Sequence, residues 1–333
     1  RQVVKNNAKK VILLDANEYS LYSVKKELES LIPEADLYGV LGSVTNKRRI
    51  TEVCKVFGVN TIYHAAAYKH VSLVEENPFE AVFNNILGTQ ACAQAALDAK
   101  VETFVLISTD KAVRPTNFMG ATKRFAELTL QALADENINK NTTKMMMVRF
   151  GNVLGSSGSA VPLFQQQIKE GGPVTVTHPE VVRYFMSIPE AAELVIQAGA
   201  MGKGGDVFVL DMGEPVKILE LAKRLISLSG MELKDKDNPK GDIEIIFTGL
   251  RPGEKLYEEL LIGANVSTTE HKQIFRAQED FITKEELDKY IIQLKEAEAE
   301  GDVVTLKEIL KQVVAGYTPG KEIVDIIYKH KQK

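Results

Sequence analysis

A short segment of the chain brings together side chains that can move protons. A strand-like apolar run, residues 104–107, is followed by Thr109, Asp110 and Lys111, and Lys123 lies in the helix-like stretch beyond. A hydroxyl, a carboxylic acid and two amines can hydrogen-bond a substrate oxygen, donate a proton and accept one. The spacing predicts a site in which these four groups surround one substrate.

The elements around this segment indicate its fold class. Strand-like runs alternate with helix-like segments, which predicts an α/β fold with a Rossmann-like doubly wound parallel sheet. The expected strands are Val11–Asp15, Leu37–Leu41, Thr61–His64, Phe104–Ile107 and Met145–Phe150. Asn77 and Pro78 predict the start of a helix that runs towards Lys100.

The first strand expected in such a sheet is missing from the start of this sequence. A dinucleotide fold normally opens with a strand and a Gly-x-x-Gly-x-x-Gly turn, whose amides hold the cofactor pyrophosphate. Here residues 1–4 read as the end of a helix, and the first strand ends at Asp15. An acidic residue at that point is typical of the second strand, where it binds the adenosine ribose. We therefore expect the natural protein to carry the missing strand and loop before Arg1.

The pattern changes after Phe150 to shorter pieces punctuated by glycine. We expect residues 1–150 and 187–212 to form the dinucleotide-binding domain, with the helix Ser187–Ala200 and the strand Val207–Leu210 returning to the sheet. Residues 151–186 and 213–282 are expected to form a smaller α/β substrate lobe.

The remaining residues, 283–333, are expected to form a C-terminal helical segment. Thr283 with Glu286, and Thr305 with Glu308, have the spacing of capping boxes, which predicts two helices. A last helix is expected near Lys321–Lys329. We expect these helices to cover the surface.

Composition excludes several classes of protein. The net charge is only -4, with acidic and basic residues mixed, so we expect no nucleic-acid partner. Cys54 and Cys92 lie among apolar residues without ligand-spaced histidines, so we expect buried thiols and no metal site. His64 and His70 are interpreted as structural. No apolar run approaches the about 20 residues that span a bilayer, so the chain as written is expected to be soluble.

Four motifs in the chain resemble those of one family. They are His64-Ala-Ala-Ala-Tyr-Lys-His70, Ser108-Thr-Asp-Lys111, Arg149-Phe-Gly-Asn-Val-Leu-Gly-Ser-Ser-Gly-Ser159 and Arg251-Pro-Gly-Glu-Lys255. From about Val11 to Ala277 the chain resembles the polysaccharide-biosynthesis UDP-N-acetylglucosamine 4,6-dehydratases, which are extended short-chain dehydrogenases.

One position departs from the wider pattern of short-chain dehydrogenases. These enzymes carry Tyr-x-x-x-Lys on the helix, whereas Met119 here takes the place of the tyrosine, four residues before Lys123. A thioether cannot exchange a proton, and Met119 is most simply a core side chain. The Met-x-x-x-Lys pattern resembles the membrane-anchored branch of the family. This implies a cytoplasmic catalytic portion, anchored in the inner membrane of a bacterium through a missing N-terminal region, and retention of configuration at C5.

The resemblance implies a redox-neutral reaction. NAD would take hydride from C4 of the sugar, the C5 proton and the C6 hydroxyl would leave, and the hydride would return to C6. Thr109 is expected to hydrogen-bond the C4 oxygen, Asp110 to protonate the C6 hydroxyl, and Lys111 to act as the C5 base if its pKa is lowered. Lys123 is expected to hold the nicotinamide ribose. The base for the C4 hydroxyl stays open between Asp110 and Lys111.

The resemblance also assigns binding residues. Asp15, Ser43, Val44, Ala65 and Ala66 are expected along the cofactor. Because a 2'-phosphate would meet the charge of Asp15, NAD is favoured over NADP.

The expected substrate residues lie further along the chain. Lys69 is expected near the sugar, and Asn152, Arg183 and Arg251 at the sugar and diphosphate. Glu254 is expected to orient Arg251 or to contact the uridine ribose. Arginine can hold phosphate with two parallel hydrogen bonds.

Alternatives stay open for both residues and function. Asp110 and Lys111 could be a solvated ion pair, Asp15 a turn residue and Arg183 an ordinary surface side chain. A UDP-sugar 4-epimerase is the nearest rival activity, and a catalytically inactive sugar-nucleotide or NAD-binding regulator is a rival of another class. A homo-oligomer formed through the helices that flank the sheet is expected.

Overall fold

The computed structural model describes residues 1–137, 143–251, 253–258 and 266–332. The strands are β1 (Val11–Asp15), β2 (Leu37–Leu41), β3 (Thr61–His64), β4 (Thr103–Ile107), β5 (Lys144–Arg149), β6 (Asn152–Val153), β7 (Val174–Val176), β8 (Val182–Arg183), β9 (Phe185–Met186), β10 (Asp206–Leu210), β11 (Val216–Lys217), β12 (Leu233–Lys234), β13 (Ile243–Phe247), β14 (Val266–Thr268) and β15 (Ile274–Ala277).

The helices are α1 (Gln2–Lys5), α2 (Glu18–Leu31), α3 (Lys47–Phe57), α4 (Val71–Glu76), α5 (Pro78–Ala81), α6 (Gly88–Asp98), α7 (Phe118–Glu136), α8 (Ala160–Lys169), α9 (Ile188–Met201), α10 (Ile218–Leu228), α11 (Lys284–Glu300), α12 (Val303–Val313) and α13 (Ile326–Lys331). A π-helical stretch, Val82–Leu87, joins α5 to α6, and a 3-10 turn covers Asp110–Ala112.

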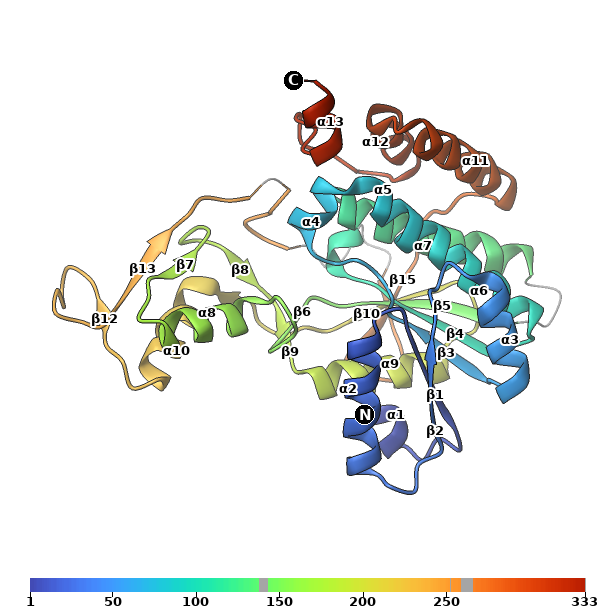
Figure 1. Cartoon of the computed structure of the whole chain (residues 1–333), viewed down its shortest axis with the longest axis horizontal. Helices are drawn as coiled ribbons and strands as arrows, with labels where there is room; N and C mark the ends of the chain where they lie inside the picture. Colours follow the sequence, from blue (N-terminus) through green and yellow to red (C-terminus); the bar gives the residue numbers. More distant parts are fainter. Residues whose placement is uncertain (138–142, 252, 259–265, 333) are drawn as a thin grey trace.

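A six-stranded sheet forms the centre of the larger body (Figure 1). Its order is β14-β15-β10-β5-β4-β3, and β10, β5, β4 and β3 run parallel. Because the carboxyl ends of parallel strands lie at one edge, the residues that follow β3, β4 and β5 come together there. The α/β fold with a central parallel sheet is confirmed.

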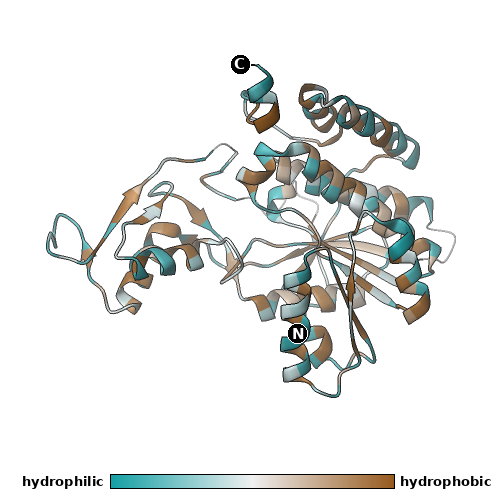
Figure 2. Cartoon of the chain, in the orientation of Figure 1, coloured by the Kyte–Doolittle hydropathy of each residue, from teal (hydrophilic) through white to brown (hydrophobic). Residues whose placement is uncertain are grey.

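Alternating side chains bury both faces of this sheet. Phe104 and Leu106 pack against α3, α6 and α7 on one face, whereas Val105 packs against α9 on the other. Apolar residues accordingly concentrate in the strands and on the helix sides that face them (Figure 2). Cys54 and Cys92 are buried in the first of these layers. The two layers fix the strand ends rigidly in space.

Strands β1 and β2 form a separate parallel pair. Among the described strands, β1 has no ladder with the six-stranded sheet, and α2 packs on the pair. Asp15 lies at the carboxyl end of β1, opposite Leu41 in β2.

A smaller lobe projects to one side of the main body (Figure 1). Its core lies between the β12-β13-β7 sheet and helices α8 and α10. Two short strand pairs, β6-β9 and β8-β11, join residues 152–153 to 185–186 and residues 182–183 to 216–217.

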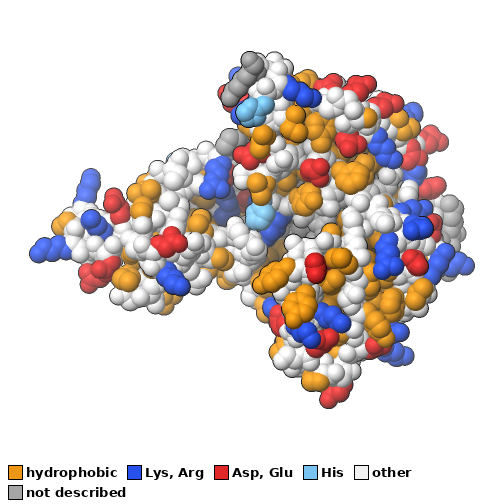
Figure 3. Space-filling view, in the orientation of Figure 1, with side chains coloured by type: hydrophobic (Ala, Val, Ile, Leu, Met, Phe, Trp, Pro, Cys, Tyr) orange, Lys and Arg blue, Asp and Glu red, His pale blue; other side chains and the backbone are white. Residues whose placement is uncertain are grey.

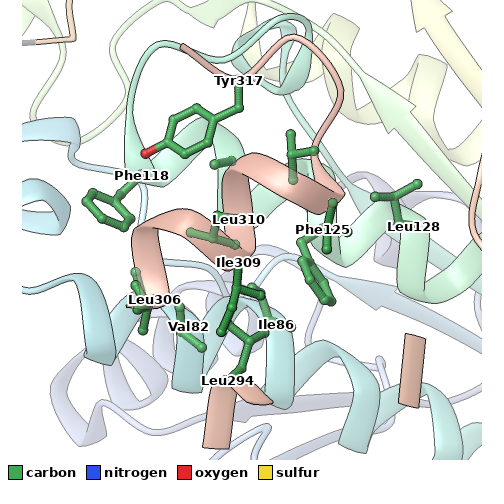
Figure 4. Close-up of a cluster of buried hydrophobic side chains, with 14 of the residues drawn as sticks. Val82, Ile86, Phe118, Phe125, Leu128, Leu294, Leu306, Ile309, Leu310 and Tyr317 are labelled. Carbon is green, nitrogen blue, oxygen red and sulfur yellow. The ribbon is translucent and has the colours of Figure 1, made fainter. Parts of the chain in front are cut away.

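The C-terminal helices form a third layer outside α7. Leu294, Leu306 and Leu310 enter a cluster with Ile86 and Phe125, and Figure 4 shows these side chains meeting. As a result, every residue of α7 from Phe118 to Leu133 is buried.

Two details of the C-terminal segment differ from the sequence prediction. Helix α11 has the capping box of Thr283 and Glu286, but α12 begins at Val303 because Asp302 accepts the amides of Val304 and Thr305. The last helix is α13, which starts at Ile326, after its cap Asp325, rather than near Lys321.

The predicted assignment of residues 266–277 to the smaller lobe is wrong. Strand β15 pairs antiparallel with β10, and β14 pairs with β15, so both extend the large sheet. An antiparallel edge strand can pair with the sheet without a crossover helix, and the sequence pattern gives no sign of it.

No helix in the described part of the chain is long and apolar enough to cross a membrane. Within the same residues, no group of three or more His, Cys, Asp or Glu side chains could hold a metal ion.

Candidate active site

The polar residues that follow β4 form a tight turn. Thr109 is extended and its hydroxyl accepts the amide of Lys111, which starts the 3-10 turn Asp110–Ala112. Helix α7 packs directly on this turn: a Cβ at Gly120 would lie 2.2 Å from the carbonyl oxygen of Lys111. The close approach requires glycine, and it fixes the turn relative to the helix that carries Lys123.

Asp110 and Lys111 form an ion pair at the mouth of the turn. Lys111 Nζ lies 3.1 Å from Asp110 Oδ1, and Thr109 Oγ1 donates to the same oxygen at 2.9 Å. The Asp110 side chain is fully buried, and its Oδ2 has no hydrogen-bond partner among the described residues. The Lys111 side chain is 21% exposed and also contacts Glu258 Oε1 at 3.1 Å. The pair is therefore not the solvated surface pair that the alternative interpretation required.

The electrostatics of this pair correct one expectation. Burial raises the pKa of the Asp110 carboxyl, in keeping with its expected role as a proton donor. Burial alone would lower the pKa of Lys111, but the charges of Asp110 and Glu258 outweigh it, and the pKa of Lys111 is raised. The lowered pKa expected for a resting base is not found, because the lysine has two carboxylate neighbours.

Lys123 lies deeper, below the end of β4. Its Nζ donates to the carbonyl oxygen of Ile107, and the residue is 6% exposed. Burial lowers the pKa of Lys123 to about 8, while the charge of Glu127 opposes the shift. His64 is buried as well, and burial together with the charge of Lys123 lowers its pKa to about 3. Met119 is 3% exposed within the apolar cluster of the C-terminal helices, so its packing agrees with a core role.

A buried charge network supports the turn from below. Glu127 accepts the Ser108 hydroxyl at 2.5 Å and the Nε of Arg149 at 2.8 Å. Arg149 also pairs with Glu279, and Arg124 joins both glutamates. Since Ser108 immediately precedes Thr109, the network anchors the turn after β4 to α7 and β5.

A pocket of about 520 Å³ opens beside the turn, between the main body and the smaller lobe. Of the four predicted catalytic residues only Lys111 is among its lining residues, together with all five predicted substrate residues, Lys69, Asn152, Arg183, Arg251 and Glu254. Thr109, Asp110 and Lys123 are outside the lining. Figure 3 shows a hollow in this region with basic and histidine side chains on its walls. Residues as far apart in the sequence as Lys69 and Lys329, 260 positions, therefore meet on one surface.

The substrate candidates hold one another in place. Arg183 is 9% exposed, and its NH2 lies 3.0 Å from Glu254 Oε1, so it is not an ordinary surface arginine. The other oxygen of Glu254 accepts the backbone amide of Arg251 at 3.2 Å, which orients the backbone at Arg251. Lys69 donates to the Ser157 carbonyl at 2.9 Å, and Lys111 Nζ reaches Asn152 Oδ1 at 3.4 Å.

The predicted cofactor residues lie outside this pocket lining: Lys123 is in α7, and the others follow β1, β2 and β3. Asp15 is exposed, and its Oδ1 accepts the Asn17 amide at 2.7 Å, which leaves its other oxygen available. Ser43 bonds Thr45, and Ala65 and Ala66 are exposed. Val44 is buried in the apolar layer, so only its backbone can face a ligand.

Sequence reasoning missed Glu258 and did not assign Lys255. Glu258 follows the Arg251–Lys255 motif by three residues, and its carboxylate is buried between Lys111 and Arg183. Lys255 donates to the Arg114 carbonyl at 2.8 Å and ties the motif to the segment just after the 3-10 turn. A second acid after the motif was the only available signal. Pro252 of the motif lies outside the described residues.

This fold, with a lysine below the end of β4 and a polar turn above it, defines an extended short-chain dehydrogenase/reductase. The chain belongs to the polysaccharide biosynthesis protein family, whose model matches residues 1–279.

Two relatives illustrate the range of the family. The chain is 52% identical over 290 residues to the capsular polysaccharide biosynthesis protein CapD of Staphylococcus aureus, covering 86% of this chain and 47% of CapD. It is 36% identical to a UDP-glucose 4-epimerase of Rickettsia rickettsii, covering 77% of this chain and 70% of the epimerase. The chain therefore spans less than half the length of CapD.

Two solved structures share the fold. Pen from Bacillus thuringiensis superposes with a TM-score of 0.73 at 33% identity, over 87% of this chain and 91% of Pen. The dTDP-glucose 4,6-dehydratase DesIV from Streptomyces venezuelae, solved with NAD and TYD bound, gives a TM-score of 0.65 at 20% identity, over 78% of this chain and 82% of DesIV.

Proposed function

We propose that this chain is the catalytic portion of an NAD-dependent, redox-neutral 4,6-dehydratase that acts on UDP-N-acetylglucosamine. The product would be a UDP-4-keto-6-deoxy-N-acetylhexosamine for surface-glycan or glycoprotein synthesis. The observation that carries the proposal is the buried Asp110–Lys111 pair beside a pocket whose lining contains Arg183 and Arg251.

The residues at the strand ends fit a dinucleotide. Asp15 offers a free carboxylate oxygen at the end of β1, and Ala65 and Ala66 present small exposed side chains at the end of β3. We assign the adenosine ribose to Asp15, which favours NAD over NADP, and the nicotinamide ribose to Lys123. When bound, NAD accepts a hydride from the sugar and returns it, so the sugar undergoes no net oxidation.

The Asp110–Lys111 contact can supply both an acid and a base. Transfer of one proton across the 3.1 Å contact turns an ammonium and a carboxylate into an amine and a carboxylic acid, without changing the net charge. The amine of Lys111 can then take the C5 proton, and Asp110 can protonate the departing C6 hydroxyl as water. Thr109, which also bonds Asp110, hydrogen-bonds the C4 oxygen. The C4 proton is released to solvent as the hydride leaves C4. Lys111 returns its proton to C5 when the hydride adds at C6, and the pair then regains one proton from solvent.

The other pocket residues hold the nucleotide sugar. Arg183 and Arg251 pair with the diphosphate, Asn152 and Lys69 contact the sugar, and Glu254 fixes Arg183 and the backbone at Arg251. The Met-x-x-x-Lys pattern supports retention at C5. Placement of the chain on the cytoplasmic side of a bacterial membrane, with an anchor elsewhere in the natural protein, rests on the same resemblance.

A UDP-sugar 4-epimerase is the second candidate, favoured by the 36% identity to the Rickettsia rickettsii protein. Epimerisation at C4 requires neither a C5 base nor a C6 acid. The buried acid–amine pair therefore favours dehydration.

Mass spectrometry separates the candidates. Incubation of the full-length protein with UDP-N-acetylglucosamine and NAD should give a product that has lost one water. An unchanged mass with inversion at C4 would establish the epimerase instead, and binding without turnover would establish an inactive regulator. In the same assay, Lys111→Ala should abolish turnover, whereas Met119→Leu should retain appreciable turnover. The reverse pattern would overturn the assignment of roles.

A further inference from the structure

Glu258 occupies the centre of the candidate site although no motif assigns it a role. Its side chain is 5% exposed, and Oε1 lies 3.1 Å from Lys111 Nζ and 3.3 Å from Arg183 Nε. A buried carboxylate is costly unless cations offset its charge, and here one oxygen meets two cations. Glu258 is therefore held between the catalytic turn and the smaller lobe.

The contacts form one chain of alternating charges. It runs from Asp110 through Lys111, Glu258 and Arg183 to Glu254, with successive contacts of 3.1, 3.1, 3.3 and 3.0 Å. Its first two members follow β4 of the large sheet, and Arg183 lies in β8 of the smaller lobe. The chain of charges links the proton-transfer pair directly to the arginine that we assign to the substrate diphosphate.

We propose that Glu258 is a positioning residue for Lys111. The Glu258 carboxylate holds the lysine amine against Asp110 and links the position of that amine to Arg183. The catalytic part of this proposal rests on the proposed function. The contact itself does not depend on the identity of the substrate.

The geometry favours positioning over a purely structural ion pair. A lysine side chain has four flexible bonds, so an amine with one carboxylate partner can adopt several positions. Asp110 and Glu258 hold Lys111 Nζ at equal distances, and Asn152 is a weaker third partner at 3.4 Å. Removing the Glu258 charge would leave the amine tied to Asp110 and, more weakly, to Asn152, with freedom to turn into the pocket.

The charges around Lys111 give the contact a measurable signature. Asp110 and Glu258 both raise the pKa of Lys111, while Arg183 and Lys255 face Glu258 from the other side. Glu258→Gln keeps the size of the side chain and removes its charge, so Lys111 should lose its proton at a lower pH. Glu254→Gln is the matched control, because Glu254 pairs with the same arginine and bonds Arg183, Thr177 and the backbone amide of Arg251.

The first measurement does not use the substrate. Trace acetylation of the folded full-length protein, quantified for each lysine by mass spectrometry across pH, reports the midpoint at which each amine becomes reactive. In Glu258→Gln the Lys111 midpoint should fall by about one pH unit, and in Glu254→Gln it should stay at the wild-type value. An unchanged midpoint in Glu258→Gln would overturn the proposal.

The second measurement tests the catalytic part. In Glu258→Gln, kcat should fall about tenfold or more, with the alkaline limb of its pH profile, where Lys111 loses its proton, moved to lower pH, whereas Glu254→Gln should mainly raise KM. Glu258→Asp, which keeps the charge, should restore the position of the limb in part. A loss of kcat that is equal at every pH would reduce Glu258 to a structural role and overturn the proposal. If the wild-type protein does not dehydrate the sugar, the proposed function fails, and the acetylation result still decides the role of Glu258.

Discussion

Asp110 and Lys111 act as a single unit because each sets the proton affinity of the other. The carboxyl is fully buried and the amine has two carboxylate neighbours, so the resting state is an ion pair. A base with a lowered pKa is therefore unnecessary for the proposed reaction, since one internal proton transfer prepares both groups. The residue types in the sequence predicted the pair. The direction in which the pKa of Lys111 shifts depends on Glu258, which is 147 positions away in the chain.

The buried imidazole of His64 gives a prediction at the same scale. Burial and the charge of Lys123 lower its pKa from 6.5 to about 3, and its Nε2 bonds Thr89 at 2.9 Å. The folded protein holds His64 neutral, whereas the unfolded chain binds a proton below its ordinary pKa. This contribution to stability is therefore present above about pH 6.5 and is lost progressively as the pH falls towards 3.

Urea unfolding at pH 7 and pH 5 measures this effect. The wild-type protein should lose about 2 kcal/mol more between the two pH values than His64→Gln does. The comparison uses the pH dependence alone, so any general loss of stability in the variant cancels. Equal losses in the two proteins would show that His64 is not held neutral.

At the scale of elements, the site depends on how closely α7 approaches the turn after β4. The sequence predicted the strand from its apolar run, and a helix-like stretch beyond it that carries Lys123. It did not predict their separation, which is set by the missing side chain of Gly120 against the Lys111 carbonyl. Helix α12 shows another limit: Thr305 and Glu308 have the right spacing for a capping box, but Asp302 reaches two free amides first.

The close approach predicts the effect of Gly120→Ala. The added methyl would meet backbone atoms at 2.2 and 3.1 Å, so the turn that carries Asp110 and Lys111 must move. We expect a loss of roughly 1–3 kcal/mol in stability and a lower kcat in the folded fraction. Gly320→Ala is the control, because a methyl there meets nothing within 4 Å. Thermal unfolding and the dehydration assay check both effects, and wild-type behaviour in Gly120→Ala would contradict this account of the contact.

At the scale of the whole molecule, the C-terminal helices change which surfaces are free. Helices α11 and α12 cover α7, so a second copy of the chain cannot pack on that helix (Figure 4). The homo-oligomer expected through sheet-flanking helices would need another face. Sequence patterns predicted three C-terminal helices that cover the surface. Packing between residues far apart in the sequence determines that two of them, α11 and α12, cover α7.

The pocket also depends on the arrangement of the whole molecule. Its walls come from β-strand ends, from the Lys69 and Asn152 segments and from the smaller lobe. The family resemblance, rather than periodicity, predicted that these residues would meet. Propensity and spacing act over a few residues, whereas the pocket depends on how two lobes are placed.

A crystal structure of the full-length protein with NAD and UDP-N-acetylglucosamine tests the central claim most directly. The account predicts that the hexose lies within hydrogen-bonding distance of Thr109, Asp110 and Lys111, and that Arg183 holds the diphosphate. A nucleotide sugar bound in the pocket with its hexose turned away from Asp110 and Lys111, or bound outside the pocket, would contradict it.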